Sequence, residues 1–406
     1  MKTSLLIATA CLLALLSTIG AALPYPILPP LFAAGVGNGL NHFLGLPPKL
    51  LFGLALTINP LGLLIGAALL GPLSDRYGRR PVLLCTALGA AIGHAVTAWA
   101  LIIESYPLFI VARFATGLLE GNGSVARALL AERLDGALRR NALSWLNGAF
   151  YMGWLAGPLL AGFTLSWGLT APFWVAVALL VMMAALAAVV LPREAPSTAT
   201  TQWWQVARDR HAFNLLRDRE LRGLFIVQLA YTCGVTAFYE FYPLWLVEVP
   251  GLNAQGIAWT TAAMCSVMIL TTVVAGRFHP ADPLLRARLL AFGTASVIAL
   301  LAASNAWIGV LAILMFGIPH SCYNAIVPNW CAERFGAHGQ GAVMGLISST
   351  FCLANILMAL AGSVLTLLDT RLILLLGAGL TAWSAWRIQS WHASMDNPAN
   401  LQTSAG

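Results

Sequence analysis

Residues 71–80 read Gly71-Pro72-Leu73-Ser74-Asp75-Arg76-Tyr77-Gly78-Arg79-Arg80, which puts four charged residues in ten positions of a chain that is only 9% charged. Apolar runs at about residues 50–70 and 81–101 flank this segment. Each run is long enough to cross a bilayer, which takes about 20 residues. We therefore expect a short charged loop at the membrane surface between two transmembrane helices. Gly71 and Gly78 would permit its tight bend, because glycine adopts backbone conformations that other residues resist.

The composition is that of a membrane protein. Hydrophobic residues make up 59% of the chain and charged residues 9%, whereas a soluble domain averages about 25% charged residues. Apolar runs long enough for one span each are centred near residues 15, 60, 91, 118, 153, 181, 235, 264, 296, 316, 350 and 381. We predict an all-α polytopic membrane protein with about twelve transmembrane helices.

The net charge of +7 reflects the topology of the chain. With the N-terminus in the cytoplasm, nearly all arginines fall in inner loops or at inner helix ends, and only Lys49 and Arg371 fall outside. This asymmetry follows the positive-inside rule. We therefore expect a multi-pass protein of the inner membrane with both termini in the cytoplasm and no nucleic-acid partner. A cleaved signal peptide at the N-terminus is less favoured, because its removal would leave an odd number of spans.

The two halves of the chain repeat one plan. Gly20, Tyr25 and Pro29 of the first span have counterparts at the same spacing in the seventh, where Glu240 stands in the position of Pro26. We expect an N-terminal six-helix bundle at residues 1–192, a cytoplasmic linker with an amphipathic segment at 193–222, a C-terminal six-helix bundle at 223–393 and a disordered cytoplasmic tail at 394–406. Parallel repeats of this kind rock about a site near the membrane midplane.

The charged segment resembles a family signature. Its pattern G-x-L-x-D-R-x-G-R-R is similar to the loop between the second and third helices of the major facilitator superfamily. The resemblance implies the fold of that family, with two pseudo-symmetric six-helix bundles. It further implies that Asp75 approaches the start of the eleventh helix and that Arg79 pairs with an acid ending the fourth, either Glu132 or Asp135. The loop residues so implicated are Gly71, Asp75, Arg76, Gly78, Arg79 and Arg80.

Two further motifs resemble those of twelve-helix drug/proton antiporters within this family. The first span carries Gly20, Pro26 and Pro29 in the family's spacing. The fifth span carries Gly153-x3-Gly157-Pro158-x3-Gly162, with Ala161 in place of one family glycine. The alternative for both motifs is a purely structural one, in which prolines bend the helix and small residues let helices pack closely.

Ionisable residues inside the predicted spans are the main candidates for function. Arg113 and Glu120 lie seven positions apart on one helical face of the fourth span, and Glu240 lies in the seventh. An intramembrane charge costs about 2.5–3.5 kcal/mol on insertion scales, so it is functional by default. The resemblance links Arg113 with proton coupling, and Glu120 and Glu240 are the candidate proton carriers. The alternative is a permanent pair of Arg113 with Glu120, or of Glu120 with Arg127, that holds the bundle together.

A substrate cavity is predicted from polar and aromatic residues in the spans. The candidates are Tyr151, Tyr239, Tyr242, His320 and Asn324, of which His320 and Asn324 share a helical face. Aromatic rings could bind a flat or cationic molecule. The alternatives are an interfacial aromatic belt and a histidine that is only hydrogen-bonded between helices.

Together these features predict a proton-coupled secondary transporter that works by alternating access and exports a small amphipathic organic compound or drug. We expect no catalytic residue, no metal site and no cofactor, with the proton gradient as energy source, because the chain has no nucleotide-binding loop, no CxxC pair and no H-E-x-x-H motif. Its partners would be the lipid bilayer, the substrate and protons, and we expect a monomer. Uptake of a metabolite, export of one metabolite or siderophore, and a non-transporting receptor stay open as alternatives.

Overall fold

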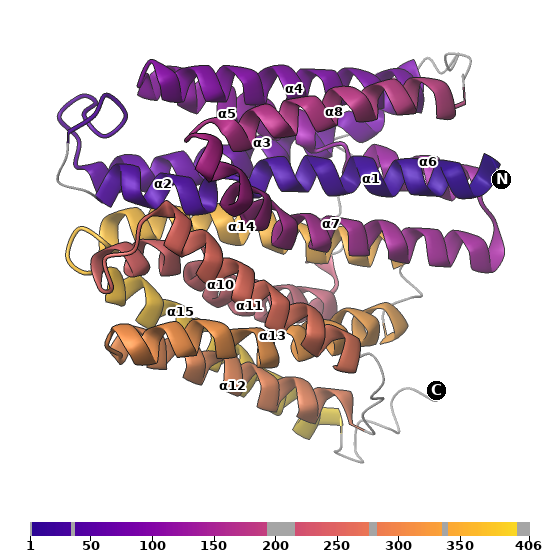
Figure 1. Cartoon of the computed structure of the whole chain (residues 1–406). Helices are drawn as coiled ribbons and strands as arrows, with labels where there is room; N and C mark the ends of the chain where they lie inside the picture. The colour runs from indigo at the N-terminus through magenta and orange to yellow at the C-terminus, as the bar shows by residue number, and fades with distance from the viewer. Residues whose placement is uncertain (1, 34–36, 193–215, 276–281, 335–339, 396–406) are drawn as a thin grey trace. The chain divides into compact units, whose positions relative to one another are not determined.

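The computed structural model describes residues 2–33, 37–192, 216–275, 282–334 and 340–395, and Figure 1 shows that these ranges are mainly helical. Most of the predicted linker 193–222 and of the tail 394–406 lies outside the described residues. Contacts divide the chain into two compact units. The first holds the helices up to α8, and the second holds α10 and α12 to α15. The division falls within α11 (Ala254–Ala275), after Ala262.

The first unit is built from spans that pack lengthwise in pairs. α1 packs along α7 and α8, α3 along α5, and α4 along α5 and α8. Figure 1 shows α1 beside α7 and α4 beside α8. The elements of this unit are α1 (Lys2–Ala22), α2 (Pro24–Ala33), α3 (Pro48–Tyr77), α4 (Arg79–Ile102), α5 (Tyr106–Glu120), α6 (Gly123–Arg133), α7 (Gly136–Thr164), the short 3-10 helix η1 (Leu165–Trp167) and α8 (Ala171–Val190).

The second unit repeats this packing. Its helix α10 packs along α14 and α15, and α12 packs along α13 and α15. These are the seventh, ninth, tenth, eleventh and twelfth predicted spans, and their pairing matches that of the first, third, fourth, fifth and sixth. The elements are α10 (Arg219–Glu248), α12 (Pro283–Ala303), α13 (Ala306–Arg334), α14 (Gln340–Leu365) and α15 (Thr370–Met395).

The prediction of an all-α polytopic membrane protein is confirmed. A helix covers each of the twelve predicted span centres. In the described ranges, nine helices are long and apolar enough to cross a membrane. The remaining predicted spans correspond to α14, α15 and the pair α5 with α6. That pair carries five charged residues, Arg113, Glu120, Arg127, Glu132 and Arg133.

The expected charged loop at residues 71–80 is much shorter than predicted. α3 continues to Tyr77 and α4 begins at Arg79, so Gly78 alone makes the bend. Its φ of +93° and ψ of 151° lie in a region that essentially only glycine adopts. The expectation that Gly71 also bends the chain is wrong, because Gly71 lies inside α3. Asp75 and Arg76 are compatible with a helix, and α3 therefore extends through them.

Two of the spans in the first unit are interrupted. The first span breaks between α1 and α2 at Leu23, just before Pro24. Proline has no backbone N–H, so the carbonyl oxygen of Gly20 lacks the donor that a continuous helix would provide. The fourth span breaks at Gly121 and Asn122, between α5 and α6. Both breaks lie beside buried charged side chains.

Candidate functional site

Arg113 and Glu120 lie inside the first unit. Both are on α5, seven residues apart, and each is only 3% exposed. In the part of the chain that the structure describes, no ion pair joins these two side chains. Arg127 does not approach Glu120 either, because its guanidinium donates to Asn147 Oδ1 at 3.2 and 3.3 Å. The alternative of a permanent pair between Glu120 and one of these arginines therefore does not describe this structure.

Arg113 binds the broken end of α1. Its two terminal nitrogens donate to the carbonyl oxygens of Gly20 and Ala21, at 3.4 and 3.0 Å. The oxygen of Gly20 is the one that Pro24 leaves without an intrahelical donor. Arg113 supplies a charged donor where the backbone cannot. Gly20 of the predicted first-helix motif and the predicted arginine of the fourth span therefore meet at one place.

Glu120 pairs with a histidine that the sequence analysis did not select. Its Oε1 lies 2.9 Å from Nε2 of His94 on α4, and the two side chains are 1% and 0% exposed. The other carboxylate oxygen, Oε2, accepts from Nδ2 of Asn59 on α3 at 3.2 Å. The same Asn59 nitrogen donates to the backbone oxygen of Arg113 at 3.2 Å. One fully buried cluster thus joins α3, α4 and α5.

Glycines bring these helices close enough for the cluster to form. A Cβ atom on Gly20 would clash with Nε2 of His94 and would lie 2.7 Å from Oε1 of Glu120. A Cβ on Gly117 would clash with the backbone of Asn59. Only glycine therefore allows α1 to contact the His94–Glu120 pair and α3 to contact α5 so closely. Gly20, predicted from the first-helix motif, is part of this cluster, whereas Pro26 and Pro29 lie further along on α2.

The second predicted carboxylate has a different environment. Glu240 is on α10 and is 1% exposed. Among the described residues, neither of its carboxylate oxygens has a hydrogen-bond partner. Burying an ionised carboxylate without a partner is costly, so a group of this kind must bind a proton or meet a partner in another state. Glu240 and Glu120 thus differ in their hydrogen bonding: Glu120 has two side-chain partners, and Glu240 has none among the described residues.

The predicted cavity residues of the second unit lie close together. His320 Nδ1 is 3.1 Å from the hydroxyl of Tyr231, and His320 Nε2 is 2.9 Å from Nδ2 of Asn324. The ring of Tyr239 meets the His320 ring edge-on, with centroids 5.8 Å apart. Tyr242, which is on α10 like Tyr239, is buried, with 2% of its surface exposed. Tyr151 is on α7, and its side chain lies outside the described part of the structure.

His320 in the second unit lies three residues after a closely packed glycine, as Glu120 does in the first. Gly317 on α13 packs against the backbone of α11 at Met264, as Gly117 on α5 packs against α3 at Asn59. Each glycine is followed three residues later by a buried titratable residue. The two repeats therefore place different chemistry, a carboxylate and an imidazole, three residues after a glycine at which two helices pack closely.

The signature residues form a compact ionic cluster at the end of α3. Arg79 Nη2 lies 2.5 Å from Oε1 of Glu132 and 2.5 Å from Oδ1 of Asp75, and Arg79 also donates to Ser74 Oγ. Of the two acids named for Arg79, the structure places Glu132 against it. Asp135 precedes α7. The Arg79 guanidinium therefore lies between two carboxylates.

The other two signature arginines have separate contacts. Arg80 donates to the carbonyl oxygen of Ala188, near the end of α8, at 2.5 Å. A cation near the last carbonyl groups of a helix interacts favourably with the helix dipole. The guanidinium of Arg76 lies over the ring of Tyr77, 5.5 Å from its centroid.

The glycines of the fifth-span motif contact the first span. A Cβ on Gly153 would lie 2.5 Å from Cβ of Thr18, and a Cβ on Gly157 would lie 2.6 Å from Cβ of Ala22. The structure therefore supports close packing of α7 on α1 for these two positions. Pro158 and Gly162 lie further along α7.

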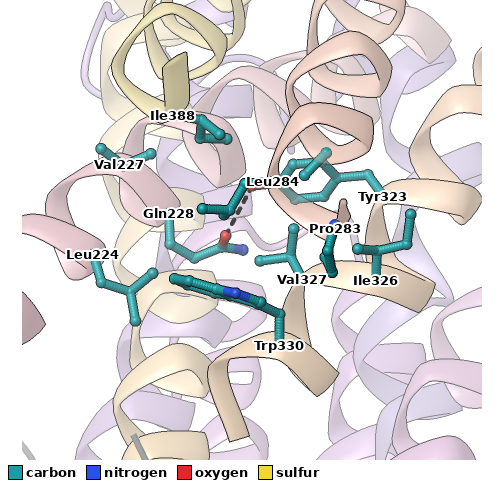
Figure 2. Close-up of a pocket in the computed structure, with 11 residues that line it drawn as sticks. Leu224, Val227, Gln228, Pro283, Leu284, Tyr323, Ile326, Val327, Trp330 and Ile388 are labelled. Carbon is teal, nitrogen blue, oxygen red and sulfur yellow. Dashed lines mark hydrogen bonds between the residues drawn. The ribbon is translucent and has the colours of Figure 1, made fainter. Parts of the chain in front are cut away.

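A small pocket lies in the second unit, away from the predicted carboxylates. Figure 2 shows the Gln228 side chain beside Tyr323, whose hydroxyl donates to Gln228 Oε1 at 3.2 Å. The pocket is mainly apolar and contains none of the predicted site residues. Its lining residues are Leu224, Val227, Gln228, Pro283, Leu284, Ala287, Tyr323, Ile326, Val327, Trp330 and Ile388.

Sequence reasoning missed three participants in the first-unit cluster: His94, Asn59 and Pro24. All three are polar or helix-breaking residues within predicted spans, and that is the signal that could have identified them. Which partner each would meet depends on how the helices are rotated, and the sequence does not specify this rotation.

The chain is similar to known transport proteins. The sequence profile of the Major Facilitator Superfamily matches residues 10–359. Tetracycline resistance protein, class G, from Vibrio anguillarum is 28% identical over 377 residues, 88% of each chain. Class B from Escherichia coli is 30% identical over 169 residues, 41% of this chain and 39% of that protein. With the class B, C and E proteins, the chain aligns over only about two fifths of their length.

Two other similarities concern a second kind of transporter and the fold. The putative niacin/nicotinamide transporter NiaP of Bacillus subtilis is 28% identical over 199 residues, 48% of this chain and 47% of that protein. The crystal structure of the human organic anion transporter MFSD10 superimposes with a TM-score of 0.70 at 21% identity, covering 95% of this chain and 99% of that one. At this level of identity, the structural similarity concerns the fold.

Proposed function

Because the chain belongs to the Major Facilitator Superfamily and is a multi-pass membrane transporter rather than an enzyme, we propose that it is a proton-coupled antiporter exporting a small amphipathic organic compound. Protons would move inward through the first unit as substrate moves outward. The protein would work as a monomer in the inner membrane, with both termini in the cytoplasm and no cofactor.

The environment of Glu120 is the observation that carries this proposal. A carboxylate bound to an arginine stays ionised, because the arginine never loses its charge. Glu120 instead contacts His94, at 2.9 Å, and Asn59. Neither partner imposes a permanent positive charge, so the site can change its number of bound protons. A proton-coupled transporter needs a buried group with that property.

Export is supported by sequence similarity. The fifth-span glycines and the first-span motif resemble those of drug/proton antiporters. The tetracycline resistance protein of class G aligns with 88% of the chain. An amphipathic aromatic compound is the substrate class that this similarity favours, and Tyr239, Tyr242, His320 and Asn324 are the proposed binding residues in the second unit, with Tyr151 in the first.

Uptake is the rival function, and the similarity to a putative niacin/nicotinamide transporter supports a small metabolite as the substrate in that case. Transport in proteoliposomes under an imposed pH gradient decides between the two. The panel should contain tetracyclines, nicotinamide, organic anions and sugars, with protein-free liposomes as control. We expect at least one compound to move against the proton flow, and a protonophore to abolish its accumulation. Movement with the proton flow would make the protein a symporter, and accumulation that ignores the gradient would contradict proton coupling.

Single replacements of the two carboxylates complete the test. Glu120→Gln and Glu240→Gln keep the size of each side chain but cannot release a proton. We expect proton-linked transport to be lost in at least one of the two variants, and we predict that Glu120→Gln loses it. If both variants stayed fully coupled, neither residue would carry the proton.

A further inference from the structure

We infer that the first unit binds its exchangeable proton on the His94–Glu120 pair, and that the proton enters at Nδ1 of His94. This inference rests on the proposed proton-coupled function and adds a second residue and a specific atom to it. His94 is on α4 and Glu120 is on α5, and both side chains are withdrawn from solvent. The inference follows from where hydrogen atoms can be placed in the cluster.

The hydrogen bond between the pair already contains one proton. Nε2 of His94 and Oε1 of Glu120 are 2.9 Å apart, so a single hydrogen lies between them. It belongs to Nε2 when Glu120 is ionised and to Oε1 when Glu120 is protonated. This position is therefore occupied in both states.

The second oxygen of Glu120 cannot accept a proton without losing a contact. Oε2 accepts a hydrogen bond from Nδ2 of Asn59 at 3.2 Å. The orientation of the Asn59 amide is fixed, because the same nitrogen lies 3.2 Å from the backbone oxygen of Arg113, which can only accept. A proton on Oε2 would point at the Asn59 amide hydrogens. The one remaining basic atom of the pair is Nδ1 of His94.

Nδ1 is also the atom whose surroundings are incomplete. It is buried and has no hydrogen-bond partner among the described residues. When the hydrogen of the ring is on Nε2, no donor occupies the lone pair of Nδ1, which is therefore free to accept a proton. Binding a proton there adds one positive charge, and the shared hydrogen can then move from Nε2 to Oε1, which leaves both side chains neutral. No other bond is made or broken.

The groups that face the pair are consistent with this change. Arg113 is the charged residue on the same helix as Glu120, and its guanidinium is bound to α1 through the oxygens of Gly20 and Ala21. Tyr25 on α2 interacts electrostatically with Arg113. α3 contributes Asn59, α8 contributes the ring of Phe173 at 6.2 Å from that of His94, and α1 contributes the backbone of Gly20. Arg113 thus balances the negative charge of the pair when Nδ1 is bare.

Nitrogen NMR of the full-length protein labelled with ¹⁵N-histidine tests the inference without any substrate. One of the seven histidines should show a bare Nδ1 and a protonated Nε2 at alkaline pH, and should gain a proton at Nδ1 as the pH falls. That signal should vanish in His94→Gln, while His320→Gln should leave it in place. If His94→Gln does not fold, Glu120→Gln should identify the same signal by shifting it. A His94 signal with Nδ1 protonated at every pH, or one that never changes, would overturn the inference.

Transport measurements separate this inference from the proposed function. His94→Gln retains a hydrogen-bond donor for Glu120 but cannot titrate. We expect the pH of half-maximal transport to fall by at least one pH unit in this variant, because the atom that accepts the proton is gone, with the apparent affinity for substrate changed less than twofold. An unchanged pH profile alongside proton-driven transport in the wild type would refute the role of His94 and leave the proposed function intact. Absence of proton-driven transport in the wild type would refute the proposed function.

Discussion

Arg113 donates a hydrogen bond to the carbonyl oxygen of Gly20, at 3.4 Å, where the helix of the first span is interrupted. The interruption is caused by Pro24, which has no N–H to offer this oxygen. The arginine therefore stabilises a break in one helix from its place in another. This relationship explains how a permanent charge is retained in an apolar bundle, and it links the first span to the helix that carries Glu120.

The first prediction is that the Arg113 side chain replaces the N–H donor that Pro24 lacks. Arg113→Gln should destabilise the protein by about 1.5–3 kcal/mol, the usual contribution of a hydrogen bond to a charged group. Pro24→Ala restores an N–H that can reach the oxygen of Gly20. In the Pro24→Ala protein, Arg113→Gln should therefore lower the free energy of unfolding by less than it does in the wild type. Thermal unfolding of the four proteins in detergent measures the difference. If Arg113→Gln destabilised the wild type and the Pro24→Ala protein equally, Pro24 and Arg113 would act independently.

The second prediction concerns the contact of Gly20 with the buried pair. Gly20→Ala places a methyl group against His94 Nε2 and Glu120 Oε1. We expect it to lower stability by about 1–3 kcal/mol, the range for overpacking, and to abolish proton-driven transport. Gly148→Ala on α7 is the matched control, since a Cβ there has no neighbour within 4 Å. Normal transport by Gly20→Ala, at wild-type stability, would contradict the close contact.

The third prediction concerns the bend at Gly78. Its backbone conformation is one that other residues adopt only with strain of about 1–3 kcal/mol. Gly78→Ala should therefore lower the unfolding temperature. Gly71→Ala should not, because its Cβ would be in ordinary contact with Ser124 at 3.5 Å. Equal effects of the two substitutions would mean that the bend is not confined to Gly78.

The fourth prediction distinguishes the two acids named for Arg79. A double-mutant cycle with Arg79→Gln and Glu132→Gln should give a coupling energy of about 1 kcal/mol that weakens as salt increases. The estimate is modest because the Glu132 side chain is 51% exposed. The corresponding cycle with Asp135→Asn should give no coupling. Coupling to Asp135 alone would place Arg79 differently from the structure.

Much of the fold was predictable because membrane spans have a strong sequence signal. The apolar runs, the arginine distribution and the pattern around Gly78 were sufficient to place the helices. The extent of the charged loop was not predictable, because Asp75 and Arg76 are as compatible with a helix end as with a loop. Helix breaks at Leu23 and Asn122 were also missed, although Pro24 gave a signal for the first.

The candidate site was only partly predictable for a physical reason. Arg113 and Glu120 stood out because charges are rare in spans. Their partners were not identified, because hydrogen bonds between helices depend on rotations of the helices about their axes. The sequence suggested that Arg113, Glu120 and Arg127 shared one face and could pair along it. The break after Gly121 begins a new helix, and there Arg127 binds Asn147 instead.

Substrate exchange compared with substrate accumulation in the Glu120→Gln variant tests the central claim most directly. Exchange of labelled for unlabelled substrate across proteoliposomes needs alternating access but no net proton movement. We predict that Glu120→Gln retains this exchange and loses accumulation driven by a pH gradient, while the wild type performs both. Accumulation at the wild-type level by Glu120→Gln, under the same gradient, would contradict the assignment of the proton to this residue.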